Sequence, residues 1–423
     1  MKRPERPARL LVAAHSHPSI SNGGAEISAW RLHAAMRARP GWDSWLVAAA
    51  RDGSNRPGSH FSQPFDDHEY LFDARTFDWF KFANQDRTFP REFTAVLGNV
   101  APDVLHFHHY IVLGVEAFLH ARRALPDCRI VLTLHEFLAI CNNHGQMVTR
   151  EKQVLCHQSS PRDCNRCYPE RSPADFFLRK TYIMGFFDLI DHFVAPSHLL
   201  ARRYIDWGLP EDRISVIENI AAAAQATDAA PAAADPSLLR IAFFGQISEL
   251  KGIGVMLDAA AILLEEGESA IQFDIHGDYA AQPTQFQIDV LERMKSAGHN
   301  VRFHGPYDNK RVDAMMRGVD AVLVPSIWWE NSPVVIQEAL RSHRPVICSD
   351  IGGMAEKVRH GIDGLHFPVG NPAALAALLK ALAKDRTRLA AITAGLRVPD
   401  PPETNVARHV ALYEKLMATP ARG

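Results

Sequence analysis

Short apolar runs alternate with amphipathic stretches along almost the whole chain. Each apolar run spans four to seven residues and ends at a polar turn, which is typical of a buried strand in a parallel sheet. The stretches between the runs carry apolar residues at helical spacing. This alternation predicts an α/β fold with parallel sheets. The predicted strands lie at residues 10–14, 103–108, 129–135, 191–197, 214–219, 239–245, 271–277, 301–305, 320–325 and 345–348.

A change in composition divides the alternation into two halves. Residues 221–237 are rich in alanine and contain Pro231 and Pro236, which is typical of a linker between domains. The length of 423 residues also favours two or three domains. Helical patterns follow in the region 371–395 and, after a break at three prolines, from Glu403 to Met417. We expect an N-terminal domain, a linker and a C-terminal domain at residues 1–222, 223–237 and 238–402.

Charge and hydropathy narrow the classes of partner. The net charge of −2 gives no electrostatic case for a nucleic-acid partner. No apolar run reaches 18 residues, and the basic residues 1–9 precede only a short strand rather than the apolar core of a signal peptide. We expect a cytoplasmic protein, with peripheral contact at the inner face of a membrane left open. Residues 174–190 mix aromatic and cationic side chains, and they predict a buried amphipathic helix rather than a membrane-resting one.

The segment from Pro325 to Leu340 carries the most specific chemical signal. It follows an apolar strand and contains Glu330 and Glu338 on either side of a Ser-Pro helix start. Ser332 can cap the helix, and Pro333 suits its first position. The helix N-terminus would then face the carboxyl end of the strand, where it favours an anion such as a phosphate.

This segment resembles the Glu-x7-Glu signature of retaining glycosyltransferases, most closely glycosyltransferase family 4 with the GT-B fold. The resemblance implies that Glu330 contacts the donor sugar and takes part in catalysis, and that Glu338 contacts the nucleotide ribose. It also implies that the intervening turn binds the donor through Asn331, Ser332, Pro333 and Val334.

Three further segments resemble the same family in the same order. Gly23 and Gly24 resemble the glycine loop that faces the donor diphosphate, although a plain tight turn would look alike. Residues 244–252 resemble the family's Gly-Arg…Lys-Gly loop, which makes Lys251 a diphosphate ligand; Gln246 stands where arginine is usual and implies an uncharged donor. His135, at a strand end, resembles the catalytic histidine that hydrogen-bonds the donor sugar.

The resemblance implies two Rossmann-like domains facing a cleft, with residues 403–423 crossing back to complete the first domain. The donor is expected in the second domain and the acceptor in the first. The implied reaction is retaining transfer of a sugar from a nucleotide sugar to a hydroxyl of a glycan or a lipid-linked acceptor, in bacterial surface polysaccharide or glycoconjugate assembly. A nucleotide-sugar 2-epimerase and a non-catalytic sugar-nucleotide-binding relative remain as alternatives. A glycoside hydrolase is disfavoured, because Glu330 and Glu338 are too far apart along the chain.

Four of the six cysteines gather in one stretch, at Cys141, Cys156, Cys164 and Cys167. In a cytoplasmic protein the terminal Cys-x2-Cys favours a structural zinc site over disulfides. Four unligated thiols are the equal alternative, and His144 and His157 could replace ligands. Cys128 and Cys348 lie in or beside apolar runs and are expected to be core thiols. No metal or other cofactor is expected to be required for catalysis.

Overall fold

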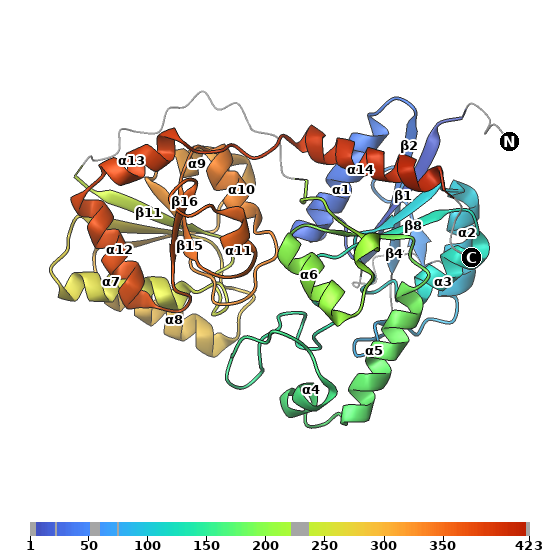
Figure 1. The fold of residues 1–423 in the computed structure, drawn as a ribbon, viewed down its shortest axis with the longest axis horizontal. Helices are drawn as coiled ribbons and strands as arrows, with labels where there is room; N and C mark the ends of the chain where they lie inside the picture. The colour runs from blue at the N-terminus through green and yellow to red at the C-terminus, as the bar shows by residue number, and fades with distance from the viewer. Residues whose placement is uncertain (1–5, 22, 51–59, 74–75, 221–236, 420–423) are drawn as a thin grey trace. The chain divides into compact units, whose positions relative to one another are not determined.

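The structure is a computed structural model that describes residues 6–21, 23–50, 60–73, 76–220 and 237–419. The chain forms two compact units (Figure 1). Residues up to Ile220 and from Pro402 onward form the first, and the residues between them form the second. Each unit contains a mainly parallel sheet with helices, as the alternating pattern predicts. The predicted linker lies, except for its last residue, outside the described residues.

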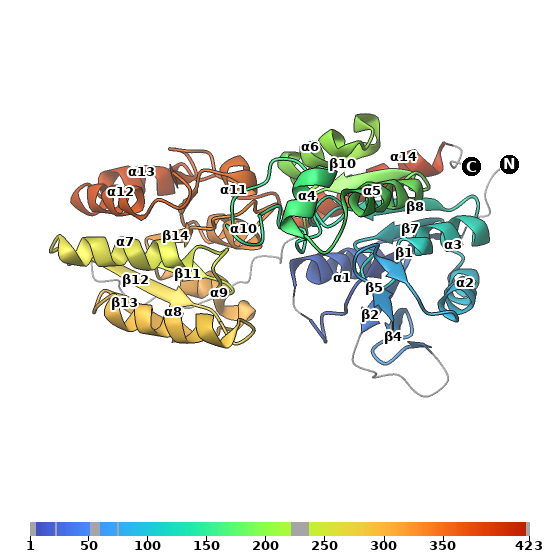
Figure 2. The same cartoon turned by 90° about the horizontal axis from the view of Figure 1, so that it is seen from below.

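The first unit is built on an eight-stranded sheet in the order β10-β9-β8-β7-β1-β2-β4-β3. Only β3 runs antiparallel to its neighbour. Figure 2 shows β1, β7 and β8 following one another across this unit. The strands are β1 (Ala8–Ala14), β2 (Trp42–Ala50), β3 (Phe61–Ser62), β4 (Glu69–Asp73), β7 (Val104–Phe107), β8 (Arg129–Thr133), β9 (His192–Ala195) and β10 (Ile214–Val216), with a separate pair β5 (Phe77–Asp78) and β6 (Ala83–Asn84).

The last helix of the chain packs on the first unit. Its residues Val406, Val410 and Tyr413 share one buried core with Leu10 and Val12 of β1. The prediction that residues 403–423 complete the first domain is therefore consistent with the packing. The helices of this unit are α1 (Gly24–Arg37), α2 (Phe89–Val100), α3 (Glu116–Ala124), α4 (Pro161–Cys167), α5 (Pro173–Phe187), α6 (His198–Trp207) and α14 (Pro402–Met417), with a 3-10 turn at Glu211–Arg213.

The second unit has a six-stranded parallel sheet in the order β13-β12-β11-β14-β15-β16. The first strand along the chain, β11, thus lies in the middle, and the chain then builds outward in both directions. This order places a topological switch point between β11 and β14, where open α/β sheets bind their ligands at the carboxyl ends of the strands. The strands are β11 (Leu239–Phe244), β12 (Ile271–His276), β13 (Val301–Gly305), β14 (Ala321–Val324), β15 (Val346–Ser349) and β16 (Gly364–Phe367).

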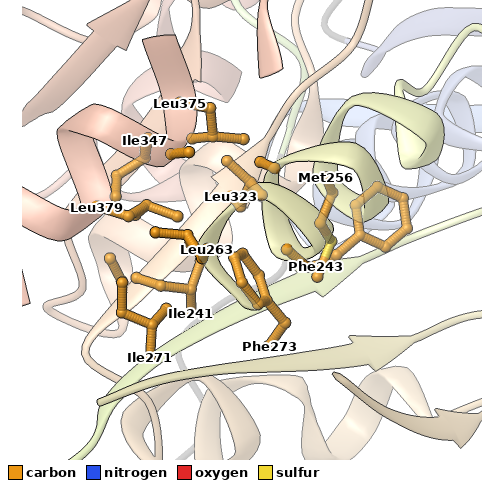
Figure 3. Close-up of a cluster of buried hydrophobic side chains, with 14 of the residues drawn as sticks. Ile241, Phe243, Met256, Leu263, Ile271, Phe273, Leu323, Ile347, Leu375 and Leu379 are labelled. Atoms are coloured by element: carbon orange, nitrogen blue, oxygen red, sulfur yellow. The ribbon is translucent and has the colours of Figure 1, made fainter. Parts of the chain in front are cut away.

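Helices cover both faces of this second sheet. On one face, Ile241, Phe273 and Leu323 of the sheet meet Leu263 and Leu379 of two helices (Figure 3). The other face packs against α9, α10 and α11. Burial on both faces explains why these strands are almost continuously apolar. The helices are α7 (Ile253–Glu265), α8 (Thr284–Ser296), α9 (Val312–Arg317), α10 (Val334–Arg341), α11 (Gly352–Lys357), α12 (Pro372–Lys384) and α13 (Thr387–Ala394), with a 3-10 turn at Asn309–Arg311.

All ten predicted strands are present, and the structure contains further strands that the apolar pattern does not predict. The longest omission is β2, whose run Trp-Asp-Ser-Trp-Leu-Val-Ala-Ala-Ala is buried along its second half. The predicted helix over residues 174–190 is α5. One of its faces is buried through Phe176 and Ile183, as expected, while Phe177 and Leu178 on the other are 61% and 58% exposed. Among the described residues, no helix is long and apolar enough to cross a membrane.

Candidate active site

The loops that follow β11 and β14 meet closely at the switch point of the second sheet. Gly252 has a φ of 72°, and a Cβ atom there would lie 1.9 Å from the carbonyl oxygen of Pro325. The peptide N–H of Ile327 donates to the carbonyl oxygen of Leu250 at 2.9 Å. Only glycine satisfies both the left-handed conformation and this close approach. The Lys-Gly pair of the sequence motif is thereby fixed against the segment that carries Glu330.

Lys251 and Glu330 form an ion pair at this point. The ammonium Nζ of Lys251 lies 2.6 Å from Oε1 of Glu330. The same oxygen accepts hydrogen bonds from the hydroxyl of Ser326 at 2.8 Å and the indole N–H of Trp328 at 3.0 Å. Glu330 is 5% exposed, whereas the side chain of Lys251 is 33% exposed. The carboxylate is therefore held rigidly inside the protein, and the cation is open to a ligand.

The backbone around Glu330 is also fixed by the start of α11. The peptide N–H of Gly353 donates to the carbonyl oxygen of Glu330 at 2.5 Å. A Cβ atom at Gly353 would lie 2.0 Å from the carbonyl oxygen of Asn331. Gly352 and Gly353 thus let two loops pack without side chains between them, and this packing positions Glu330 and Asn331.

The predicted cap of α10 is wrong by one residue. The helix begins at Val334, Pro333 occupies the N-cap position, and no side chain caps the helix. The reason is the ψ of 118° at Pro333, which is extended rather than helical. Ser332 therefore lies before the cap, where it is buried in the turn.

Glu338 lies in the middle of α10 and is partly exposed. Its charge acts on Tyr307: burial, and then the negative charge of Glu338, raise the pKa of the Tyr307 phenol. Gln246, which follows β11 directly, is exposed. The structure thus places Gln246, Lys251 and Glu330 in the two loops of the switch point, with Glu338 on the helix that follows the second loop.

Gly23 in the first unit packs against a buried carboxylate. It has an extended backbone, with φ −75° and ψ 159°, as the N-cap of α1, and Gly24 is the first residue of the helix. A Cβ atom at Gly23 would lie 2.3 Å from Oε2 of Glu26. The glycine therefore makes room for the buried carboxylate of Glu26 rather than supplying a positive φ. Ser21 donates to this carboxylate, and His15 lies 3.2 Å from it.

His135 belongs to a histidine group at the carboxyl ends of β1, β7 and β8. Its Nε2 lies 3.1 Å from Nδ1 of His108, so one of the two rings donates to the other. The rings of His15 and His109 pack with centroids 4.4 Å apart. Burial, and then the neighbouring charge of His15, lower the pKa of His135 to about 3. The imidazole of His135 is therefore neutral at physiological pH, and it acts as a hydrogen-bond partner rather than as a cation.

Two members of this polar group, His108 and Glu26, are not among the site residues predicted from the sequence. Glu26 is 4% exposed, and although burial opposes it, the hydrogen bond with His15 lowers the pKa of Glu26. Their positions in the sequence were the signal that could have found them, because polar residues that follow parallel strands meet at one edge of the sheet.

Two family models match the chain in succession. The model described as Glycosyltransferase Family 4 matches residues 22–221, and the model described as Glycosyl transferases group 1 matches residues 226–395. The chain belongs to glycosyltransferase family 4, group 1. Its second match contains every residue of the switch-point site, and its first contains Gly23 and His135.

Individual relatives of this family member cover only parts of it. A D-inositol 3-phosphate glycosyltransferase of Nocardia farcinica is 33% identical over 209 residues, which are 47% of this chain and 46% of that protein. The amylovoran biosynthesis glycosyltransferase AmsK of Erwinia amylovora is 28% identical over 186 residues, or 42% and 43% of the two chains. The matched part of this chain thus spans less than half the length of either curated relative.

The fold is shared over the full length with solved structures. Anabaena HepE, solved in complex with UDP and glucose, superimposes with a TM-score of 0.64 and 16% identity, covering 96% of this chain and all of that one. This likeness identifies the architecture of the family member as GT-B. Within the described residues, no three His, Cys, Asp or Glu side chains are arranged to hold a common metal ion.

Proposed function

We propose that this chain is a retaining glycosyltransferase that moves a sugar from a nucleoside diphosphate sugar to an acceptor hydroxyl. One observation carries the proposal: the Lys251–Glu330 ion pair at the carboxyl ends of β11 and β14. It places a ligand-accessible cation beside a buried, oriented carboxylate at the position where sheets of this order bind nucleotides.

The cation would serve the leaving diphosphate. Negative charge grows on the diphosphate as the bond to the sugar breaks, and a positioned ammonium stabilises that charge. Lys251 supplies the ammonium, and the uncapped N-terminus of α10 adds peptide dipoles of the same sign. Gln246 contributes neutral hydrogen bonds where other family members carry an arginine.

The two carboxylates would bind the remaining parts of the donor, which are its sugar and its ribose. Glu330 accepts hydrogen bonds from sugar hydroxyls, and Asn331, Ser332, Pro333 and Val334 form the turn beside it. Glu338 accepts from the ribose diol. In the first unit, we assign Gly23 and Gly24 to donor binding and the neutral imidazole of His135 to a hydrogen bond with the sugar.

The acceptor is proposed from the relatives. By their names, one relative is a D-inositol 3-phosphate glycosyltransferase and another is a glycosyltransferase of amylovoran biosynthesis. We assign this chain a hydroxyl acceptor on a glycan or a lipid-linked glycan, in bacterial surface polysaccharide or glycoconjugate assembly on the cytoplasmic side. The exposed Phe177 and Leu178 of α5, followed by Lys180, suit peripheral contact with a membrane.

A panel of nucleotide sugars tests the function directly. One donor should raise the melting temperature, since a ligand at 100 times its dissociation constant adds about 2.7 kcal/mol of stability. With that donor and a hydroxyl acceptor, NMR should show a product with the anomeric configuration of the donor. Isomerisation of the donor without an acceptor would instead identify a 2-epimerase, and binding without any product would identify a non-catalytic relative.

A further inference from the structure

The outer part of a long segment of the first unit contains no buried residue. Residues 134–172 join β8 to α5 and form a lobe whose one helix is the short α4 (Figure 1). The root of the lobe is anchored, because the buried guanidinium of Arg179 donates to the carbonyl oxygens of Leu138 and Ala139 at 2.7 and 2.5 Å. Beyond it, no residue from Thr149 to Asp175 is buried. A segment of this size with no apolar core needs a cross-link of another kind.

Four cysteines from three separate places in the lobe line the same cavity. Cys141 ends a turn, with its N–H donating to the carbonyl oxygen of Phe137 at 2.8 Å. Cys156 lies on a hairpin closed by a bridge between Val148 and Leu155. The remaining two stand three residues apart on α4. Together the four line a single cavity of about 70 Å³, at Cys141, Cys156, Cys164 and Cys167.

The surroundings of the cavity favour thiolate ligands over the alternatives. None of the four cysteines forms a disulfide. The peptide N–H of Arg150 donates to Sγ of Cys167 at 3.3 Å, a contact that stabilises negative charge on sulfur. His144 and His157, the alternative ligands from the sequence, are not among the lining residues.

We propose that these four thiols ligate one structural Zn²⁺ ion that cross-links the lobe. Structural zinc sites are tetrahedral and closed, and four thiolates are one of their standard ligand sets, with Zn–S bonds of about 2.3 Å. The four sulfur atoms are not placed at such distances in the structure. Binding therefore draws them inward by rotation about their Cα–Cβ bonds, and up to four protons leave as the thiols become thiolates.

The zinc site would shape a larger neighbouring cavity. A space of about 600 Å³ lies between the lobe and the helices α5 and α6, lined by Pro161 and Cys164 on one side and by Lys180, Met184 and Trp207 on the other. Cys164 therefore belongs to the walls of both cavities. Fixing the thiols fixes the position of α4, and with it one wall of this space.

Metal analysis of the full-length protein, purified without chelator, tests the proposal without any sugar transfer. We expect close to one equivalent of zinc, released by a mercurial that captures thiolates. Cobalt substitution should give the intense sulfur-to-cobalt absorption of a four-thiolate site. Cys164→Ser and Cys167→Ser should each lose most of the metal, whereas Cys128→Ala, which changes a buried cysteine outside the lobe, should keep it.

The proposal is overturned by any of three results on the unmodified protein. These are less than about a tenth of an equivalent of metal together with four freely titrating thiols, a disulfide within the lobe found by mass spectrometry, or iron in place of zinc. None of these depends on whether a variant folds.

Discussion

At the scale of single residues, the site depends on how Lys251 is shared between Glu330 and a ligand. In the proposed function, Glu330 and the donor diphosphate both attract Lys251, whose ammonium lies 2.6 Å from the carboxylate. Ser326 and Trp328 also donate to the same carboxylate oxygen, so Glu330 keeps two neutral partners when Lys251 turns to a diphosphate. The lysine can therefore be recruited without leaving a buried carboxylate bare.

Lys251→Ala should impair catalysis far more than folding. Loss of one charged contact to the leaving group should lower kcat/KM by roughly 100- to 1,000-fold. The free energy of unfolding should fall by only about 1–2 kcal/mol, because Glu330 loses one partner of three. Lys295→Ala, an exposed lysine on α8, is the matched control and should leave both quantities unchanged. Turnover of the Lys251 variant within a few-fold of wild type would refute the diphosphate role.

Buried neutral histidines should make the protein less stable in acid. Burial lowers the pKa of His409 to about 4, from an ordinary value of 6.5. Between these values the unfolded chain binds a proton that the folded chain does not, so stability falls as pH falls below about 6.5. Protonation at this residue should lower the free energy of unfolding by roughly 2 kcal/mol between pH 7 and pH 5.

His409→Gln removes that titration and keeps a polar side chain near the carbonyl oxygen of Asn405. Urea unfolding of wild type and variant at pH 7 and pH 5 measures the effect. The stability lost on acidification should be smaller in the variant by about the amount given above. An identical loss in the two proteins would show that His409 is not held neutral by the fold.

At the scale of elements, the site depends on the contact between the loops after β11 and β14. Gly252 is the point of contact, since a Cβ atom there would overlap the carbonyl oxygen of Pro325. The positions of Lys251 and Glu330 follow from this contact rather than from either loop alone.

Gly252→Ala should abolish donor binding by forcing the two loops apart. Gly267→Ala is a close control, because Gly267 has a φ of 74° against 72° at Gly252 but has nothing within 4 Å of an added Cβ atom. Both variants carry the cost of a left-handed alanine, about 1–2 kcal/mol. Only Gly252→Ala should lose the thermal shift given by the donor. An equal donor-induced thermal shift in the two variants would mean that the contact between Gly252 and Pro325 does not shape the site.

The elements themselves could largely be predicted from the sequence, and their contacts could not. Strands buried on both faces, such as β11 and β14, are apolar throughout and stand out between polar turns. The strand β2 was missed because its first half alternates buried with half-buried residues. The cap of α10 was misplaced because Ser-Pro fits two adjacent positions, and the ψ of Pro333 decides between them.

At the scale of the whole molecule, the strand order of the second sheet brings motifs that are distant in sequence together at one site. The loops bearing Lys251 and Glu330 are 79 residues apart in sequence, and only the order β11-β14 makes them neighbours. The motif residues were recognisable one by one. The ion pair and the hydrogen bond between His135 and His108 required the fold, because no local sequence pattern encodes contacts between distant strands.

The central claim is that a nucleotide binds at this switch point, with Glu338 at the ribose and Glu330 at the sugar. Calorimetric titration of UDP, ADP and GDP into wild type and two variants tests it most directly. For the diphosphate that wild type binds, Glu338→Gln should raise the dissociation constant by about 10- to 100-fold, since a charged hydrogen bond contributes roughly 1.5–3 kcal/mol. Glu330→Gln should bind it within about threefold of wild type, because it leaves the ribose contact intact and releases Lys251 to the diphosphate. An equal loss of affinity in both variants, a loss only in the Glu330 variant, or no binding of any diphosphate to wild type would contradict the account.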